Sequence, residues 1–244
     1  MRYFILTSDK YSFLLEGYIE LWDRHWGDKS ITMEIVGFDT PIINLPDNFI
    51  FHSLGKQSDY TTWSEPLITF FSEIESDKFF LSFEDHFIVK DVNKEIMNEG
   101  INYMNEGNID KLFLLPEYGY RGIGLYKDNW YKCGNTPNSN CASSLLPSIW
   151  GKEFFMKLLK NNIKTPWEFE TKHNSLTDYN VLITDGTEVF VPLDAMRGGK
   201  FNSQIFNHWE HDKSVGPQKY YQNIDNEDID IFKKMKIKWE KNTM

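Results

Sequence analysis

The sequence predicts an α/β fold in which helices flank a mainly parallel sheet within a single domain. Short apolar runs alternate with helical patterns through the first half of the chain, as in sheets that are covered by helices on both faces. The length of 244 residues suits one such domain with a single core. Hydrophobic residues make up 41% of the chain and can supply that core.

The composition also limits the class of function. A formal net charge of −10 argues against a nucleic-acid partner, because affinity for a polyanion depends on Lys and Arg side chains that neutralise phosphates. Any bound phosphate must therefore be held locally, by backbone amides, a few basic side chains or a metal ion. Aromatic residues reach 16%, which favours exposed platforms for flat, ring-shaped ligands.

The N-terminus and the cysteines bear on the compartment. The first apolar run is too short for a signal peptide, and no stretch approaches the roughly 20 apolar residues of a membrane span. We therefore expect a cytoplasmic protein with no transmembrane segment. Cys133 and Cys141 lie in a stretch rich in Asn, Gly, Pro and Ser, and we expect two free thiols; a disulfide or a metal pair is the alternative.

The first half of the chain alternates between short apolar runs, which are typical of strands, and apolar residues at helical spacing. Apolar runs predict strands over residues 2–7, 33–38, 49–53, 79–83 and 110–115. Apolar residues at helical spacing predict helices over 11–26, 63–75 and 92–106. Ligands of such sheets bind beyond the carboxyl ends of the strands, so the site is expected there.

The second half has a different character. A stretch over 118–144 predicts a hairpin and a long loop over the site. Helices are expected over 149–160 and 166–170, and a hairpin is expected from 180–185 with 188–191. We expect residues 1–205 to form the domain and residues 206–244 to form a C-terminal extension that packs on it.

Glu84, Asp85 and His86 follow the apolar run 79–83. Mg²⁺ and Mn²⁺ prefer carboxylate oxygens, and acids at a strand end can hold such an ion against a nucleotide diphosphate. The alternative is a solvated turn or a helix N-cap.

Thr7, Ser8, Asp9 and Lys10 follow the first predicted strand. Hydroxyls and an Asp at a strand-to-helix junction can cap the helix, which is the structural interpretation. In the functional interpretation the same groups line a nucleoside pocket, where backbone amides at the helix start favour an anion.

Glu168 and Glu170 flank an aromatic residue just after Pro166, near the start of a predicted helix. Either carboxylate is a candidate base that removes a proton from an acceptor hydroxyl, while Trp167 stacks on a sugar face. Stabilisation of the helix dipole by the acids is the alternative.

A later group contains paired glycines between two cations. Gly198 and Gly199 permit close backbone approach, and Arg197 and Lys200 could hold phosphate. A simple turn is the alternative. His208 follows as a candidate metal ligand, although a lone His is more often structural.

Four blocks of sequence, taken in order, resemble one group of enzymes. The blocks are TSDKYSFLLEGYIELWDRHW, LPDNFIFHSLGKQSDYTTWSEPL, FFLSFEDHFI and SIWGKEFFMKLLKNNIKTPWEFE. They resemble the GT-A-like glycosyltransferases of cyanophages, other viruses and bacterial surface-polysaccharide clusters. The last block is the most specific, and the resemblance covers roughly residues 1–205.

This resemblance implies a GT-A fold, a nucleotide-sugar donor at the first strand ends and Mn²⁺ or Mg²⁺ as cofactor. Asp85 resembles the acid of the metal-and-diphosphate motif, and Glu168 or Glu170 occupies the place of the base. The donor-binding candidates are Thr7, Ser8, Asp9, Tyr11, Gly55, Trp63, Glu84, Arg197 and Lys200, and Asp85 and His208 are the metal candidates. The usual Asp-any-Asp motif is Glu84-Asp85-His86 here, so either Asp85 binds the ion with donor oxygens and water, or the enzyme dispenses with metal.

The sequence thus favours transfer of a sugar from a nucleotide-diphosphate sugar to an acceptor hydroxyl on a glycan or surface polysaccharide. Inversion and retention at the sugar both remain open. A sugar nucleotidyltransferase is the first rival, although the segment from Thr7 to Phe13 lacks the Gly-rich loop such enzymes carry. A non-catalytic carbohydrate-binding protein is the second.

Overall fold

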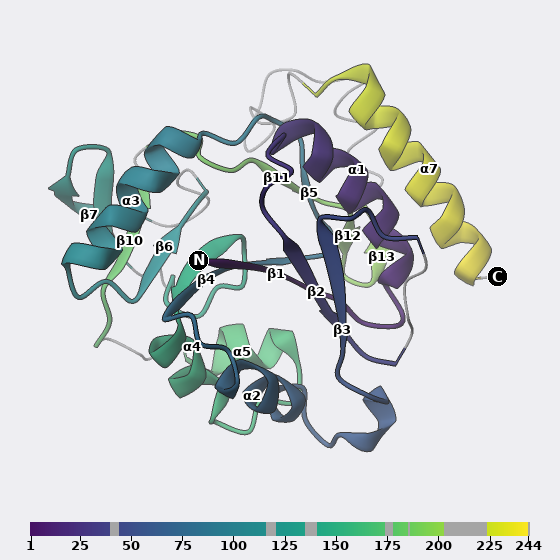
Figure 1. The fold of residues 1–244 in the computed structure, drawn as a ribbon, viewed down its shortest axis with the longest axis horizontal. Coiled ribbons are helices and arrows are strands. Elements are labelled where there is room, and N and C mark those ends of the chain that lie inside the picture. Colours follow the sequence, from purple (N-terminus) through teal and green to yellow (C-terminus); the bar gives the residue numbers. More distant parts are fainter. Residues whose placement is uncertain are drawn as a thin grey trace.

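The computed structural model describes residues 1–39, 44–115, 121–134, 141–173, 178–184, 186–202 and 224–243. A nine-stranded sheet crosses the molecule in the order β3-β2-β1-β4-β9-β6-β10-β8-β7 (Figure 1). The strands are β1 (Arg2–Leu6), β2 (Met33–Gly37), β3 (Phe49–Ser53), β4 (Lys78–Phe83), β6 (Lys111–Phe113), β7 (Arg121–Lys127), β8 (Trp130–Gly134), β9 (Ser148–Gly151) and β10 (Val181–Thr184). Within this sheet β9 and β8 run against the direction that the other strands share. The predicted fold class, an α/β fold with a mainly parallel sheet between helices, is confirmed.

The sheet separates two layers of helices (Figure 1). One layer contains α1 (Leu15–His25), α3 (Lys94–Glu106) and α7 (Asn226–Thr243). The other contains α2 (Ser64–Ser72), α4 (Lys152–Leu159) and α5 (Pro166–Lys172). Within β1, Ile5 packs into the first core and Phe4 into the second, because successive side chains of a strand point to opposite faces.

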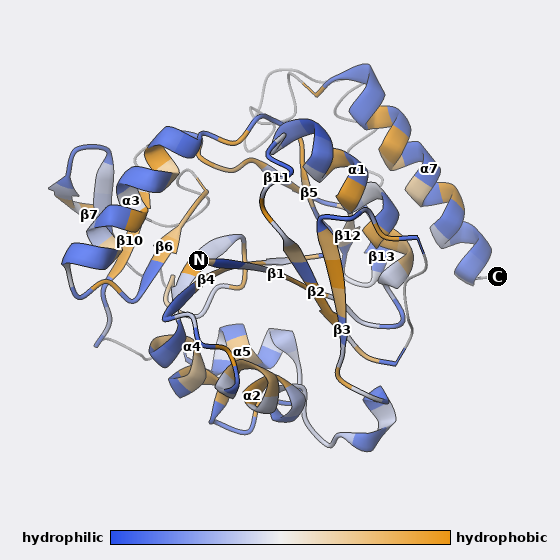
Figure 2. Cartoon of the chain, viewed as in Figure 1, coloured by the Kyte–Doolittle hydropathy of each residue, from blue (hydrophilic) through white to orange (hydrophobic). Residues whose placement is uncertain are grey.

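Hydropathy follows this layering. The central strands carry hydrophobic residues, and the outer side of α7 is hydrophilic (Figure 2). Among the described helices none is both long and apolar enough to cross a membrane.

The strands and helices predicted in the first half are confirmed as β1, β2, β3, β4 and β6 and as α1, α2 and α3. Two short 3₁₀ helices, η1 (Ser12–Leu14) and η2 (Gln57–Asp59), precede α1 and α2. The predicted helix over residues 11–26 therefore begins as a 3₁₀ turn and continues as α1.

The predicted helix over residues 149–160 is wrong at its start. Residues Ser148–Gly151 form β9, which lies between β4 and β6 and is antiparallel to both. Ile149 and Trp150 are both fully buried but belong to different cores, one on each face of the sheet. Two adjacent apolar residues fit a doubly covered strand as well as a helix, so periodicity could not separate the two.

The predicted hairpin between residues 180–185 and 188–191 is also wrong. Strand β10 pairs with β6 and β8 instead. The chain then crosses to β11 (Pro192–Asp194), which pairs antiparallel with β5 (His86–Ile88) directly after β4. Two further short strands, β12 (Met196–Arg197) and β13 (Lys200–Phe201), form a small hairpin.

The hairpin expected within residues 118–144 is confirmed as β7 and β8. It extends the far edge of the sheet, beyond β10, rather than covering the ends of β1 and β4. The antiparallel pairing of β8 with β10 fixes it there, because each strand of a sheet needs a partner for its backbone groups.

Candidate functional site

The carboxyl ends of β3, β2, β1 and β4 meet at one edge of the sheet. Thr7 directly follows β1, and its N–H donates to the Val36 carbonyl at 2.9 Å. Glu84 directly follows β4, and its N–H donates to the Leu6 carbonyl at 3.2 Å. Parallel sheets bind ligands beyond this edge, so the side chains that gather here form the candidate site.

Glu84 points into the protein at this edge. Its side chain is buried, and burial raises its pKa well above the ordinary value, with a further contribution from the charge of Asp85. Hydrogen bonds from backbone N–H groups, including that of Ser8, and from the Thr7 hydroxyl act in the opposite direction. Glu84 therefore ties the loop after β1 to the end of β4.

Asp85 is partly exposed and has a second acid beside it. Its side chain is 27% exposed, and its carbonyl accepts the Ala195 N–H at 2.7 Å. In the β5–β11 ladder His86 lies opposite Asp194, which brings Asp194 to the same place. Burial raises the pKa of Asp85, His86 lowers it, and the charge of Asp194 raises it further.

Asp194 was not among the candidates from the sequence. Asp194 ends the apolar run VFVPLD, just as Asp85 follows the apolar run 79–83. An acid at the end of an apolar run is therefore the sequence feature that indicates both residues. The pairing of β5 with β11, which sequence periodicity does not reveal, is what turns two separate strand ends into one acidic pair.

The acidic pair fits the divalent ion expected from the sequence only in part. Among the described residues no group of three or more His, Cys, Asp or Glu side chains could hold a metal ion. Mg²⁺ is commonly held by one or two carboxylates, with substrate phosphates and water completing its shell. Asp85 and Asp194 match that donor set. His208 lies outside the described residues.

The loop after β1 meets the hairpin of β12 and β13. The Tyr11 hydroxyl lies 3.8 Å from the position that a Cβ atom on Gly199 would take. Gly198 and Gly199 have φ values of 57° and 77°, a left-handed backbone that favours glycine. The turn therefore carries the exposed Arg197 and Lys200 to the side of the site where Tyr11 lies.

Two other donor-binding candidates lie on the next loops. Gly55 has a φ of 84°, and its N–H donates to the Ser53 hydroxyl at 3.2 Å. Trp63 stacks on Phe83 at the end of β4, with 6.5 Å between ring centroids, and meets Phe169 of α5 edge-on at 5.9 Å. Trp63 thus connects the end of β4 to α5.

Glu168 closes the N-terminus of α5. Its carboxylate accepts the Lys164 N–H at 2.6 Å, and its own N–H donates to the Thr165 hydroxyl at 3.0 Å. This arrangement is similar to a capping box, but the carboxylate accepts the N–H of the residue before the N-cap rather than that of Thr165. The Lys164 N–H, together with the charge of Lys172, lowers the pKa of Glu168. Trp167 beside it is 70% exposed, as a stacking platform requires.

Glu170 points the other way. Its carboxylate accepts the Leu145 N–H at 2.8 Å, and its carbonyl accepts the Ser143 hydroxyl at 2.8 Å. Burial raises the pKa of Glu170, while Leu145 and the charges of Lys111 and His86 lower it and Asp194 raises it. Phe169, the residue before Glu170, meets Trp63, and Trp63 stacks on Phe83 at the end of β4, so this part of α5 lies near the strand end that carries the acidic pair.

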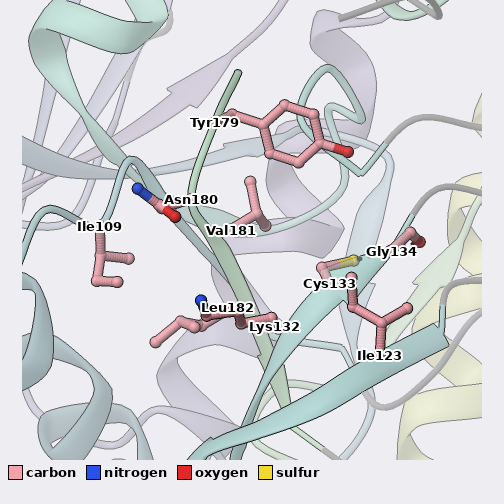
Figure 3. Close-up of a pocket in the computed structure, with 9 residues that line it drawn as sticks. All are labelled: Ile109, Ile123, Lys132, Cys133, Gly134, Tyr179, Asn180, Val181 and Leu182. Atoms are coloured by element: carbon pink, nitrogen blue, oxygen red, sulfur yellow. Dashed lines mark hydrogen bonds between the residues drawn. The ribbon is translucent and has the colours of Figure 1, made fainter. Parts of the chain in front are cut away.

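A cavity of about 220 Å³ lies elsewhere, against β8 and the start of β10 (Figure 3). Apolar side chains make up much of its wall, which is formed by Ile109, Ile123, Lys132, Cys133, Gly134, Tyr179, Asn180, Val181 and Leu182. Cys133 lines it, but none of the candidate catalytic or donor-binding residues does, and its lining contains no carboxylate. The chemistry therefore points to the strand-end site rather than to this cavity.

Comparisons with known proteins give distant likenesses. No family model matches the sequence, and no curated protein matches it. Among solved structures, residues 1–349 of S. aureus TarS align with 78% of this chain at 14% identity and a TM-score of 0.46, and the chain spans 60% of that protein's length. A cytidylyltransferase from Leptospira borgpetersenii aligns with 96% of this chain and 93% of its own at 10% identity and a TM-score of 0.47. A UDP-glucose pyrophosphorylase aligns with 79% and 92% at 11% identity and a TM-score of 0.45.

Proposed function

We propose that this chain is a glycosyltransferase that moves a sugar from a nucleotide-diphosphate sugar to an acceptor hydroxyl. The observation that carries the proposal is the pairing of two acids, Asp85 and Asp194, together with a separate half-buried carboxylate, Glu170, on the helix that packs near the end of β4. An acidic pair suits the diphosphate half of the donor, and a carboxylate of raised pKa suits a base.

In the proposed reaction Glu170 accepts the proton of the acceptor hydroxyl. The acceptor oxygen then forms a bond to the anomeric carbon, and the bond from that carbon to the diphosphate oxygen breaks. The electron pair of that bond leaves with the nucleotide diphosphate. A divalent ion, when bound by Asp85 and Asp194, would supply positive charge next to the diphosphate.

Other residues have supporting roles in this proposal. Arg197 and Lys200 can contact phosphate from the exposed turn between β12 and β13. The loop of Thr7, Ser8, Asp9 and Tyr11 is proposed to line the nucleoside side. Trp167 offers its exposed indole to a sugar ring of the acceptor.

A sugar nucleotidyltransferase is the second candidate, because the acidic pair would serve a nucleoside triphosphate equally well. Glu170 distinguishes the two proposals. The nucleophile of nucleotidyl transfer is a phosphate oxygen that already carries negative charge, so it requires no protein base. A half-buried carboxylate held by the 141–145 turn, with a raised pKa, therefore favours transfer to a neutral hydroxyl.

A thermal-shift screen with UDP, GDP, CDP, ADP and dTDP, each with and without Mn²⁺, tests the proposal first. A ligand at about 100 times its Kd stabilises the folded state by about 2.7 kcal/mol, which raises the Tm by several degrees for a chain of this size. We expect one diphosphate to do so more strongly with Mn²⁺. Asp85→Asn and Asp194→Asn should remove the Mn²⁺-dependent part, whereas Asp230→Asn, an exposed acid on α7 that pairs with Lys233, should not.

The nucleotide found in this way then selects the donors for a turnover assay. Release of nucleotide diphosphate from its sugar conjugates supports glycosyl transfer. Release of pyrophosphate from the triphosphate and a sugar 1-phosphate would instead favour the nucleotidyltransferase. A protein that binds sugars but none of the diphosphates would contradict both.

A further inference from the structure

Lys111 is a fully buried lysine with no assigned role. It is the first residue of β6, where it pairs with Trp150 of β9 and Val181 of β10. Its relative exposure is 0%, and it is among the largest fully buried side chains. Burying an ammonium group is costly unless it is well satisfied, so its contacts indicate its purpose.

The ammonium group of Lys111 bridges two backbone carbonyls of one turn of the chain. Its Nζ atom donates to the Cys141 carbonyl at 3.0 Å and to the Ser144 carbonyl at 2.5 Å. It also lies 4.0 Å from the centroid of the Trp150 ring, on which a cation is favourable. Lys111 thereby fixes both ends of the turn formed by residues 141–144.

The same turn holds Glu170. The Ser143 hydroxyl donates to the Glu170 carbonyl, and the Leu145 N–H donates to the Glu170 carboxylate. Backbone and carboxylate of Glu170 are thus both attached to the segment that Lys111 fixes. Lys111 and Glu170 thus bind the same short turn, one through its carbonyls and the other through its Ser143 hydroxyl and Leu145 N–H.

We infer that Lys111 is a positioning residue for Glu170, which it holds through the turn of residues 141–145. The role of Glu170 as a base rests on the proposed function, whereas the attachment of the turn by Lys111 does not. In this arrangement the lysine sets where the carboxylate points and does not itself touch the substrate.

The cost of burying the Lys111 charge favours a positioning role for this residue over a purely stabilising one. Burial lowers the pKa of Lys111 to about 7, against the opposing influence of Cys141, Cys133 and Glu170. Replacing a buried charged group with a well-packed apolar one of similar size is often neutral or stabilising. A lysine in this strand therefore contributes a specific position for its neighbours rather than stability.

Lys111→Met separates the two roles, with Lys152→Met as the matched control. Lys152 also donates to two backbone carbonyls, those of Ser72 and Ile74, but it holds the end of α2. We expect Lys111→Met to lower kcat by about 10–100-fold, since small misplacements of a reacting group can cost about 100-fold. Its donor KM should not change, and its Tm should stay constant or rise. Lys152→Met should leave kcat unchanged.

Hydrogen exchange gives a readout that needs no activity. The Leu145 amide should exchange faster in Lys111→Met and in Glu170→Ala than in the unaltered protein, and not in Lys152→Met. Unchanged exchange in Lys111→Met would overturn the inference. Faster exchange in a protein that transfers no sugar supports the attachment and contradicts only the proposed function.

Two further outcomes are decisive. Faster exchange with an unchanged kcat would overturn the positioning role, as would a kcat that falls only in step with the Tm. If Lys111→Met does not fold, Lys111→Leu replaces it, because it also removes both hydrogen bonds to the turn but occupies less volume. The same fall in kcat with unchanged donor KM is then expected, and its absence would overturn the inference.

Discussion

Glu168 and Glu170 lie two positions apart on α5, but their carboxylates have opposite surroundings. Glu168 accepts a backbone N–H at the helix start and lies beside Lys172, which together lower its pKa. Glu170 is enclosed by the 141–145 turn, and burial raises its pKa. A base must be able to accept a proton, so the raised pKa makes Glu170 the better candidate of the two.

Glu170→Gln should lower kcat by about 10²–10⁴-fold, because the amide keeps the shape but cannot accept the proton. The control is Glu168→Gln, since the Gln amide oxygen at that position can still accept the Lys164 N–H and the change should leave kcat nearly unchanged. The acidic limb of the kcat/KM profile gives a second check. The base acts when ionised, so activity should be lost as the pH falls through the raised pKa of Glu170, above 4.5. Equal kcat values for the two variants would remove Glu170 from the mechanism.

At the scale of elements, α7 is fastened to α1 by a cluster of charges. The His25 ring contacts Asp228 of α7 through Nε2 at 3.0 Å and Asp91 through Nδ1 at 3.1 Å. Arg24 reaches the other oxygen of Asp228 at 3.1 Å. Burial lowers the pKa of His25, but its hydrogen bonds to Asp228 and Asp91 outweigh this effect and raise the pKa above its ordinary value.

This raised pKa gives the stability a defined pH dependence. The contribution of His25 is fully present below the unfolded-state pKa of about 6.5 and is lost as the pH rises through the higher folded-state value. In urea unfolding, the free-energy difference between the unaltered protein and His25→Gln should therefore be larger at about pH 6 than at about pH 9. Lys111, whose pKa burial lowers, changes the stability with the opposite sign but does so in both proteins, so it cancels in this difference. His25→Gln should cost about 2 kcal/mol at the lower pH.

The control for this prediction is His52→Gln, on the half-exposed ring that contacts Glu34 between β3 and β2. This variant should retain the pH dependence, because α7 and its charges are untouched. A His25→Gln protein with the same pH dependence as the unaltered chain would show that other groups cause it.

Gly100 decides how closely α3 approaches the outer half of the sheet. A Cβ atom there would lie 2.5 Å from the ring of Trp130 on β8 and 3.0 Å from Leu112 on β6. Gly100→Ala should therefore displace the fully buried Trp130 at a cost of about 1–3 kcal/mol, more than the roughly 1 kcal/mol gained by Ala in a helix. Gly124→Ala on β7 has open space around it and is the control. Chemical denaturation of both proteins measures the difference, and equal midpoints would contradict this account of the packing.

At the scale of the whole molecule, the sequence predicts what depends on local pattern. The alternation of β1, α1, β2, β3, α2 and β4 could be predicted because each element buries a face with its own periodicity. Strand β9 and the β5–β11 ladder could not, because their partners are distant in the chain. The candidate site follows the same division. Asp85 follows a strand that the sequence predicts. The roles proposed for Asp194 and Lys111 depend on strand pairings that the sequence does not reveal.

The place of β9 also constrains how a nascent chain can fold. Strands β4 and β6 leave the ribosome well before residues 148–151, yet β9 separates them in the finished sheet. Until it arrives, two inner strand edges with apolar side chains on both faces have no partner, and such edges invite pairing with other chains. The N-terminal half therefore depends on a late insertion at its centre, which makes rapid completion of synthesis, or a chaperone that shields these edges, important for its yield.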